Sequence, residues 1–206
     1  MVVTTCSLGP VDPDRVYVGI EAGALLVSED GGETWIDRPE GARRDNHQLA
    51  THPDAPGRVY SAAGDGYAES RDGGHHWDHP QEGLDHRYVW SVAADPGDPD
   101  TVLVSAASGA RSAHRTGESY VYRRRGEDAT WTRIGDEYDD DAGLATGQGT
   151  YRYVLAAGET AGELWALSNT GLFRTSDAGD SWERVDVEWP DRWADESAAG
   201  LAVVDE

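Results

Sequence analysis

Short apolar runs separated by clusters of Gly, Pro and Asp recur along the whole chain. The runs are rich in Val, Leu, Tyr and Trp or Ala, and β-branched and aromatic residues favour strands, whereas Gly, Pro and Asp favour tight turns. No segment keeps the 3.6-residue period of an amphipathic helix. The pattern therefore predicts an all-β protein. The expected strands cover residues 15–19, 49–50, 58–62, 89–93, 101–105, 154–156 and 163–167.

A motif that ends in Trp repeats in step with these runs. Three segments read Ser/Thr-x-Asp-x-Gly-x-x-Trp, and a fourth, 124–131, keeps the Trp but lacks the Ser/Thr and has its Asp displaced. Successive Trp residues of the motif are 42, 54 and 51 positions apart, and a blade of four short strands takes about 40–50 residues. The spacing predicts one four-stranded unit for each motif. The motif residues are Ser28, Asp30, Gly32 and Trp35; Ser70, Asp72, Gly74 and Trp77; Trp131; and Thr175, Asp177, Gly179 and Trp182.

The residue types of the motif suit a hairpin turn. The Asp carboxylate accepts hydrogen bonds from nearby backbone N–H groups, and the Gly supplies a positive φ that other residues resist. The Trp then buries a large aromatic face between neighbouring layers of strands. We expect the motif to stabilise the fold and to take no part in chemistry.

The motif resembles the Asp-box, or BNR, repeat of sialidases, sortilin-type propellers and photosystem II assembly-factor-like proteins. The longer pattern, residues 12–19 followed by 28–35, is most similar to BNR-repeat proteins labelled glycosyl hydrolase or sialidase-like, including those of halophilic archaea. The resemblance implies a β-propeller of four-stranded antiparallel blades. We expect one propeller domain over residues 1–206, with units at about 1–42, 43–84, 85–146 and 147–206.

The number of units leaves the closure of the propeller open. Four units form either a small closed ring or an arc of a larger propeller. Residues 200–204 are predicted to form one further innermost strand, which would close a ring by docking beside the first unit. Residues 2–6 compete for the same place. If the ring is incomplete, we expect self-association.

The charge balance is strongly acidic. The chain has 39 Asp and Glu against 17 basic residues, all of them Arg, and a formal net charge of −22. Molar salt screens such self-repulsion, so we expect a halophilic source; a GC-rich genome would account for the missing Lys but not for the acidic excess. The surface excludes a nucleic-acid partner, which needs a basic stripe. The run Arg123–Arg125 is too short to provide one and is expected on a solvated hairpin.

The remaining composition points to a cytoplasmic protein. Cys6 is the only cysteine, so no disulfide framework is present. No basic segment with an apolar run follows Met1, and no run is long enough to span a membrane. We expect no cofactor. No close spacing of His residues indicates a metal site, and Asp139–Asp141 is expected to be a solvated loop without spaced calcium ligands.

Polar residues that precede the inner strands are the candidates for binding. In a propeller these positions share one face with the loops between the second and third strands, and the Asp-box turns lie toward the opposite face. Converging His, Arg and Tyr side chains would bind an anionic or sugar-like ligand; alternatively they are polar strand ends that face water. For His47 and His86 a structural role is expected more than catalysis. The candidates are His47, His86, Arg87, Tyr88, Arg111, Arg115, Tyr151 and Arg152, with Glu21, Asp65, His114 and Asn169 on neighbouring loops.

Two functions fit this arrangement. The first is a non-catalytic binding or assembly scaffold for a protein or for a small anionic or carbohydrate ligand. The second, implied by the resemblance, is a sialidase-like hydrolase with three Arg around the substrate carboxylate and a Tyr nucleophile. Arg87, Arg152 and either Arg111 or Arg115 would form the trio, with Tyr88 or Tyr151 nearby. The family's Phe/Tyr-Arg-Ile-Pro motif is absent, and only the pairs Tyr151-Arg152 and Phe173-Arg174 remain, so we favour the scaffold.

Overall fold

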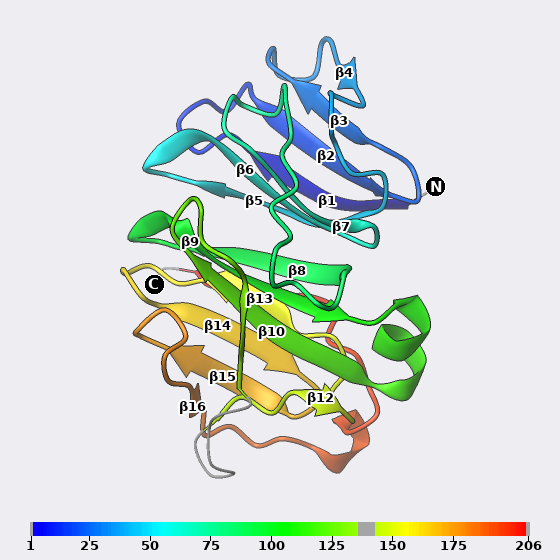
Figure 1. Cartoon of the computed structure of the whole chain (residues 1–206), viewed down its shortest axis with the longest axis vertical. Coiled ribbons are helices and arrows are strands. Elements are labelled where there is room, and N and C mark those ends of the chain that lie inside the picture. The colour runs from blue at the N-terminus through cyan, green and yellow to red at the C-terminus, as the bar shows by residue number, and fades with distance from the viewer. Residues whose placement is uncertain (1, 136–142, 205–206) are drawn as a thin grey trace.

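The computed structural model describes residues 2–135 and 143–204, which form four small antiparallel sheets (Figure 1). The first sheet contains β1 (Val2–Leu8), β2 (Val16–Glu21), β3 (Leu25–Ser28) and β4 (Ile36–Asp37). The second contains β5 (Asn46–His52), β6 (Ala55–Ala63) and β7 (Gly66–Ser70), with a bridge from Glu69 to Asp78 at its edge. The third contains β8 (Tyr88–Asp95), β9 (Asp98–Ala107), β10 (Glu118–Arg125), β11 (Thr132–Ile134) and, paired to β10, β12 (Gly147–Gln148). The fourth contains β13 (Val154–Ala157), β14 (Leu164–Ser168), β15 (Gly171–Thr175) and β16 (Glu183–Arg184).

The strands follow the pattern of the sequence. Each strand expected between residues 15 and 167 overlaps an observed one, because the apolar runs are bounded by Gly, Pro and Asp turns that end them. Two short helical turns, η1 (Ser112–Thr116) and η2 (Asp191–Trp193), were not predicted. Within the described residues no helix has the length and apolar character needed to cross a bilayer. The predicted loop Asp139–Asp141 lies outside the described residues.

The first strands of successive sheets lie side by side. The Leu49 N–H donates to Thr5 Oγ1 at 3.3 Å, and the Leu155 N–H donates to Ser91 Oγ at 2.8 Å. Ser91 also donates to the side chain of Gln48. These bonds join β1 to β5 and both β5 and β13 to β8, so the four sheets are the blades of a β-propeller. The first and fourth blades lie at opposite ends of the molecule (Figure 1), and the four blades form an arc.

The motif Trp of each later blade packs against the blade before it. Trp77 is 6 % exposed, Trp131 3 % and Trp182 1 %. Each lies in a buried cluster that combines apolar side chains of two successive blades. Examples of the partners in the preceding blade are Tyr17 for Trp77, Tyr67 for Trp131 and Leu103 for Trp182. Apolar packing in these clusters therefore joins each blade to the one before it.

Trp35 differs from the expected burial. It is 41 % exposed, although its indole donates to Gly32 O at 3.0 Å, as that of Trp77 does to Gly74 O at 2.9 Å. The described residues place no blade before the first. The ring surface that Trp77 buries against the preceding blade is therefore exposed in Trp35. Self-association, expected if the ring is incomplete, stays a prediction.

The three complete motifs share one pattern of hydrogen bonds. Ser28 Oγ donates to Asp30 Oδ1 and accepts the Gly32 N–H, both at 2.8 Å. Asp30 Oδ1 also accepts the Thr34 N–H at 2.8 Å. The same atoms make the same bonds in the second and fourth blades. Gly32 and its counterparts have φ of 94°, 92° and 86°, which side chains strain to adopt.

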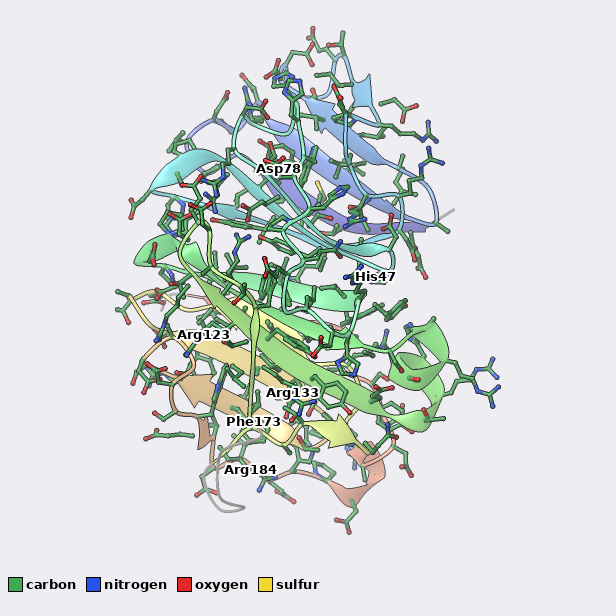
Figure 2. All side chains as sticks on the ribbon, in the orientation of Figure 1. His47, Asp78, Arg123, Arg133, Phe173 and Arg184 are labelled. Atoms are coloured by element: carbon green, nitrogen blue, oxygen red, sulfur yellow. The ribbon has the colours of Figure 1, made fainter. Side chains whose placement is uncertain are left out.

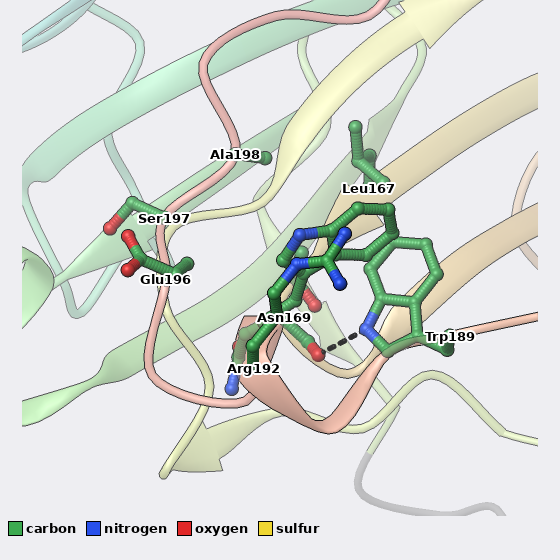
Figure 3. A pocket seen from close by; sticks show the side chains of 9 residues that line it. Leu167, Asn169, Trp189, Arg192, Glu196, Ser197 and Ala198 are labelled. Carbon is green, nitrogen blue, oxygen red and sulfur yellow. Dashed lines mark hydrogen bonds between the residues drawn. The ribbon is translucent and has the colours of Figure 1, made fainter.

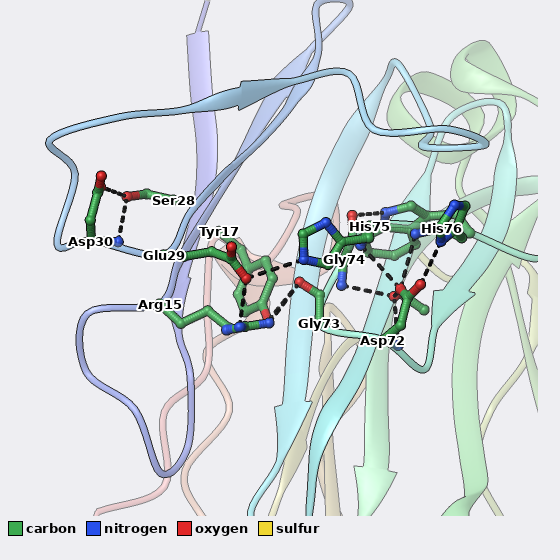
Figure 4. Close-up of polar contacts among 12 residues, drawn as sticks. Arg15, Tyr17, Ser28, Glu29, Asp30, Asp72, Gly73, Gly74, His75 and His76 are labelled. Carbon is green, nitrogen blue, oxygen red and sulfur yellow. Dashed lines mark hydrogen bonds and ion pairs between the residues drawn. The ribbon is translucent and has the colours of Figure 1, made fainter.

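The motif turn of the second blade also binds the first blade (Figure 4). Arg15 Nη2 donates to Glu29 Oε1 at 2.6 Å, and Arg15 Nη1 donates to Gly73 O at 3.3 Å. The Tyr17 hydroxyl donates to the same carbonyl at 3.3 Å. A hypothetical Cβ at Gly74 would lie 3.0 Å from the Tyr17 ring, so the glycine also permits close packing of the two blades.

The run Arg123–Arg125 is not a solvated hairpin, contrary to the prediction. It lies on β10, where alternate side chains point to opposite faces of the sheet. Arg124 is fully buried toward the second blade and pairs with Glu69, whereas Arg123 and Arg125 pair with Asp180 of the fourth at 2.8 and 2.9 Å. The three guanidinium groups thus join three blades.

The predicted strand at 200–204 is also wrong. The structure has no strand there, and β1 forms the first strand of the first blade. β1 is joined to β2 by a short turn, so its pairing costs less loop-closure entropy than docking the far end of the chain. The C-terminal segment instead lies near the fourth blade, where Asn169 Nδ2 donates to Ala194 O at 2.8 Å and Trp189 Nε1 donates to Asn169 O at 2.7 Å.

Candidate functional site

The start of the second blade's inner strand lies beside the turn between the second and third strands of the first blade. The Ala22 N–H donates to Asp45 Oδ1 at 2.7 Å, and the Gly23 N–H donates to Arg44 O at 2.7 Å. Glu21 at the end of β2 is therefore next to Asp45, one residue before β5. The two carboxylates lie on the face where sequence analysis placed the candidate residues.

Two inner strands each insert an extra residue at the same place. The pairing of β5 with β6 skips His47, and the pairing of β8 with β9 skips Trp90. Such β-bulges turn a side chain away from the regular alternation of the strand. The rings of His47 and Trp90 meet with centroids 4.6 Å apart. Figure 2 shows His47 at the boundary between the second and third blades.

A stack of rings extends from His47 across the third blade. The His47 ring lies 5.0 Å from that of Tyr88, and His114 of η1 contacts Trp90 edge-to-face at 5.2 Å. The Tyr88 hydroxyl shares a hydrogen bond of 2.6 Å with His114 Nε2. The Arg152 guanidinium lies 3.9 Å from the centroid of the Trp90 ring, close enough for a cation–π interaction. The second, third and fourth blades thus contribute to one cluster.

Burial shifts the proton affinities in this cluster. Burial raises the pKa of Tyr88 to about 12, and the charges of Asp45 and Glu21 act in the same direction. Burial lowers the pKa of His114, and the nearby positive charge of Arg152 acts in the same direction. Burial also lowers the pKa of Arg152, against the influence of Tyr88 and Glu21. Around neutral pH the cluster therefore presents a neutral phenol and a neutral imidazole beside the Arg152 cation.

The structure brings together three of the eight predicted binding residues: His47, Tyr88 and Arg152. Trp90 and Asp45 were not among the predicted residues. Trp90 lies inside an apolar run that reads as a buried strand, and only the bulge exposes its ring to the cluster. Asp45 precedes His47 by two residues, a spacing that was a usable signal.

Within the described residues, the other five predicted residues make no ring or cation–π contact with this stack. His86 stacks on Tyr120 at 4.1 Å, and the Tyr122 hydroxyl lies 2.5 Å from its Nδ1. The Tyr151 N–H donates to Asn169 Oδ1 at 2.8 Å. The remaining three residues are exposed. The positive charge of one of them, Arg87, helps to lower the pKa of Arg43. The exposed residues are Arg87, Arg111 and Arg115.

A hollow of about 510 Å³ lies at the fourth blade, and Asn169 is the predicted residue that lines it (Figure 3). Trp189 and Trp193 meet edge-to-face there with ring centroids 5.0 Å apart, and Arg192 lies over Trp193 at 5.4 Å. The C-terminal segment forms one wall and the end of β14 forms the other. The lining residues are Leu167, Ser168, Asn169, Trp189, Arg192, Trp193, Glu196, Ser197 and Ala198.

Comparison with solved structures establishes the same class of protein, a β-propeller. An ancestral GH74 enzyme superposes with a TM-score of 0.69 over 89 % of this chain and 24 % of its own, at 16 % identity. The GH74 enzyme of Niastella koreensis gives 0.64 over 86 % of this chain and 30 % of its own, also at 16 % identity. YCF48 bound to D1 peptide gives 0.54 over 92 % of this chain and 55 % of its own, at 14 % identity.

These likenesses concern the fold alone. The chain spans less than a third of the length of the two GH74 enzymes and just over half of that of YCF48. No protein-family model matches the sequence, and no curated protein matches it. One fold hosts many functions, so the chemistry must come from the site itself.

Proposed function

We propose that this arc of β-propeller blades is a non-catalytic binding scaffold and that it binds a segment of a partner protein at the stack around Trp90. The observation that carries the proposal is the stacking of Arg152 on Trp90. Half-buried aromatic and Arg side chains are typical centres of binding energy at protein interfaces. The Arg152 Nε is buried and has no hydrogen-bond partner within the described residues, so a ligand carbonyl or carboxylate that reached it would satisfy this N–H. YCF48, which shares the fold, was solved bound to a peptide.

The hydrolase alternative has less support. It requires three Arg side chains around one substrate carboxylate. Of the Arg residues predicted for that role, only Arg152 lies in the cluster, whereas Arg87, Arg111 and Arg115 are exposed. Tyr88, a predicted nucleophile, shares its hydroxyl proton with His114 and has a raised pKa. A phenol of this kind ionises less readily than an ordinary one.

The binding proposal is testable with peptides from a random display library selected on the wild-type chain in molar KCl. We expect Arg152→Ala and Trp90→Ala each to weaken the selected peptides by at least tenfold, or about 1.4 kcal/mol. Arg111→Ala is the matched control, because Arg111 is exposed on the N-terminal side of η1, and it should leave affinity unchanged. Equal losses in all three variants would refute the site. Hydrolysis of a fluorogenic sialoside that Arg152→Ala abolishes would establish the enzyme instead.

We further propose that the scaffold works in a halophile, because its net charge is −22. We expect the melting temperature to rise by at least about 5 °C when KCl is raised from roughly 50 mM to molar concentration. For a chain of this size, such a shift corresponds to a gain of ~2 kcal/mol in the free energy of unfolding. Sucrose at the same osmolality controls for effects other than screening. A melting temperature that does not change with KCl would contradict the proposal.

A further inference from the structure

We propose that Glu21, Asp45 and His47 bind a first-row divalent transition-metal ion, of which Zn²⁺ is the test case. One oxygen from each carboxylate and one imidazole nitrogen lie within 4.8 Å of one another. The three residues come from two blades, so a bound ion would connect the end of β2 to the start of β5. This inference is independent of the proposed binding of a protein segment.

The hydrogen bond of His47 leaves its second ring nitrogen facing the Asp45 carboxylate. Nδ1 lies 2.8 Å from Val89 O, a carbonyl that can only accept, so Nδ1 carries the proton. In the neutral ring, Nε2 then carries a lone pair. Nε2 is buried without a hydrogen-bond partner in the described part of the chain, and the side chain is 0 % exposed. Such a carbonyl contact to the second nitrogen is how proteins commonly orient a metal-binding imidazole.

Asp45 faces this lone pair with a carboxylate oxygen. Its Oδ2 lies 3.8 Å from His47 Nε2, too far for a hydrogen bond, and both atoms are acceptors. Its Oδ1 is held by the Ala22 N–H at 2.7 Å. A cation between Oδ2 and Nε2 would satisfy both.

Gly64 leaves room for the Asp45 carboxylate. A Cβ at position 64 would lie 2.0 Å from Asp45 Oδ2, a distance that no real structure tolerates, while the Gly64 N–H donates to Asp45 O at 2.9 Å. The φ of Gly64 is not in the left-handed region. Glycine is therefore required here because a side chain would not fit, and not because of the backbone conformation. Gly64→Ala would displace the carboxylate without removing a ligand.

The donor set selects the class of ion. One imidazole and two carboxylates suit Zn²⁺ and its first-row neighbours, whereas Ca²⁺ and Mg²⁺ prefer oxygen ligands alone. Ligand atoms on a tetrahedral Zn²⁺ lie about 3.3 Å apart, so Nε2 and Oδ2 need to approach by roughly half an ångström. The positive charge of Arg152, which interacts with Glu21, disfavours binding of a cation. A water molecule would complete the coordination.

The test is calorimetric titration of the full chain with ZnCl₂ in molar KCl, with Mg²⁺ in excess to occupy the many surface carboxylates. We expect one Zn²⁺ per chain, and we expect His47→Gln, Asp45→Asn and Gly64→Ala each to weaken binding by about tenfold or more. His86→Gln is the matched control, since His86 Nε2 lies 3.6 Å from the single carboxylate of Glu118. Its affinity should equal that of the wild type.

Three results would overturn the proposal: no stoichiometric Zn²⁺ binding by the wild type, unchanged binding in both His47→Gln and Asp45→Asn, or an equal loss in His86→Gln. Because Glu21 is exposed, Glu21→Gln changes a proposed ligand with little effect on folding. Circular dichroism without metal shows whether each variant folds. Peptide binding measured with a chelator present tests the proposed function separately, so either hypothesis can fail alone.

Discussion

Trp77→Ala is expected to lower the free energy of unfolding by about 3–5 kcal/mol, and Trp35→Ala by about 1 kcal/mol or less. Both indoles donate to the carbonyl of the motif glycine three residues before them, at 2.9 and 3.0 Å. Both also end the same turn. Only Trp77 has a preceding blade to pack on, so it is 6 % exposed and Trp35 is 41 % exposed. The difference between the two losses therefore measures the packing of one blade on the next.

Urea unfolding followed by far-UV circular dichroism in molar KCl gives both values. Trp182→Ala, at 1 % exposure, should behave like Trp77→Ala. Similar losses for Trp35→Ala and Trp77→Ala would show that the Trp acts within its own blade and that contact between blades contributes little.

Glu69→Gln is expected to cost about 3 kcal/mol or more at neutral pH, since removal of one partner leaves a buried charge uncompensated. Glu69 and Arg124 are 2 % and 0 % exposed and form an ion pair between the second and third blades. Tyr67 donates to Glu69 Oε2 at 2.8 Å, and Arg71 Nη2 donates to Oε1 at 3.2 Å. Asp180→Asn is the matched control: Asp180 pairs with Arg123 and Arg125 but is half exposed, so its loss should be within about 1 kcal/mol.

The loss at Glu69 should depend on pH. Burial raises the pKa of Glu69, but Arg124, the Tyr67 hydrogen bond and Arg58 outweigh it and hold the pKa below its ordinary value of 4.5. A carboxyl whose pKa is lowered by folding contributes stability above its unfolded pKa, and that contribution disappears as pH falls through the folded value. The difference between wild type and Glu69→Gln should thus be constant above about pH 5 and shrink in more acidic buffer. A difference that grows on acidification would contradict the assigned ion pair.

Local sequence predicted the face of the candidate site but only part of its membership. The rule that residues before the inner strands share one face holds for His47, Tyr88 and Arg152, because it follows from propeller topology. It does not tell which side chains turn inward. Arg87 directly precedes Tyr88 yet is exposed, and His86 stacks on Tyr120 instead. Trp90 joins the site through a bulge, whose position depends on how β8 pairs with β9.

The sequence by itself determined the strands, the turns and the repeat of the Trp motif. These depend on contacts within a few residues: Asp30 binds the backbone four residues on, and each glycine supplies a backbone angle that its neighbours cannot. Only the tertiary structure decided which groups meet across blades. It exposed Trp35, buried Arg124 against Glu69 and brought Glu21 beside His47, because each of these outcomes depends on the blade that packs against the residue and not on the residue's own neighbours in the chain.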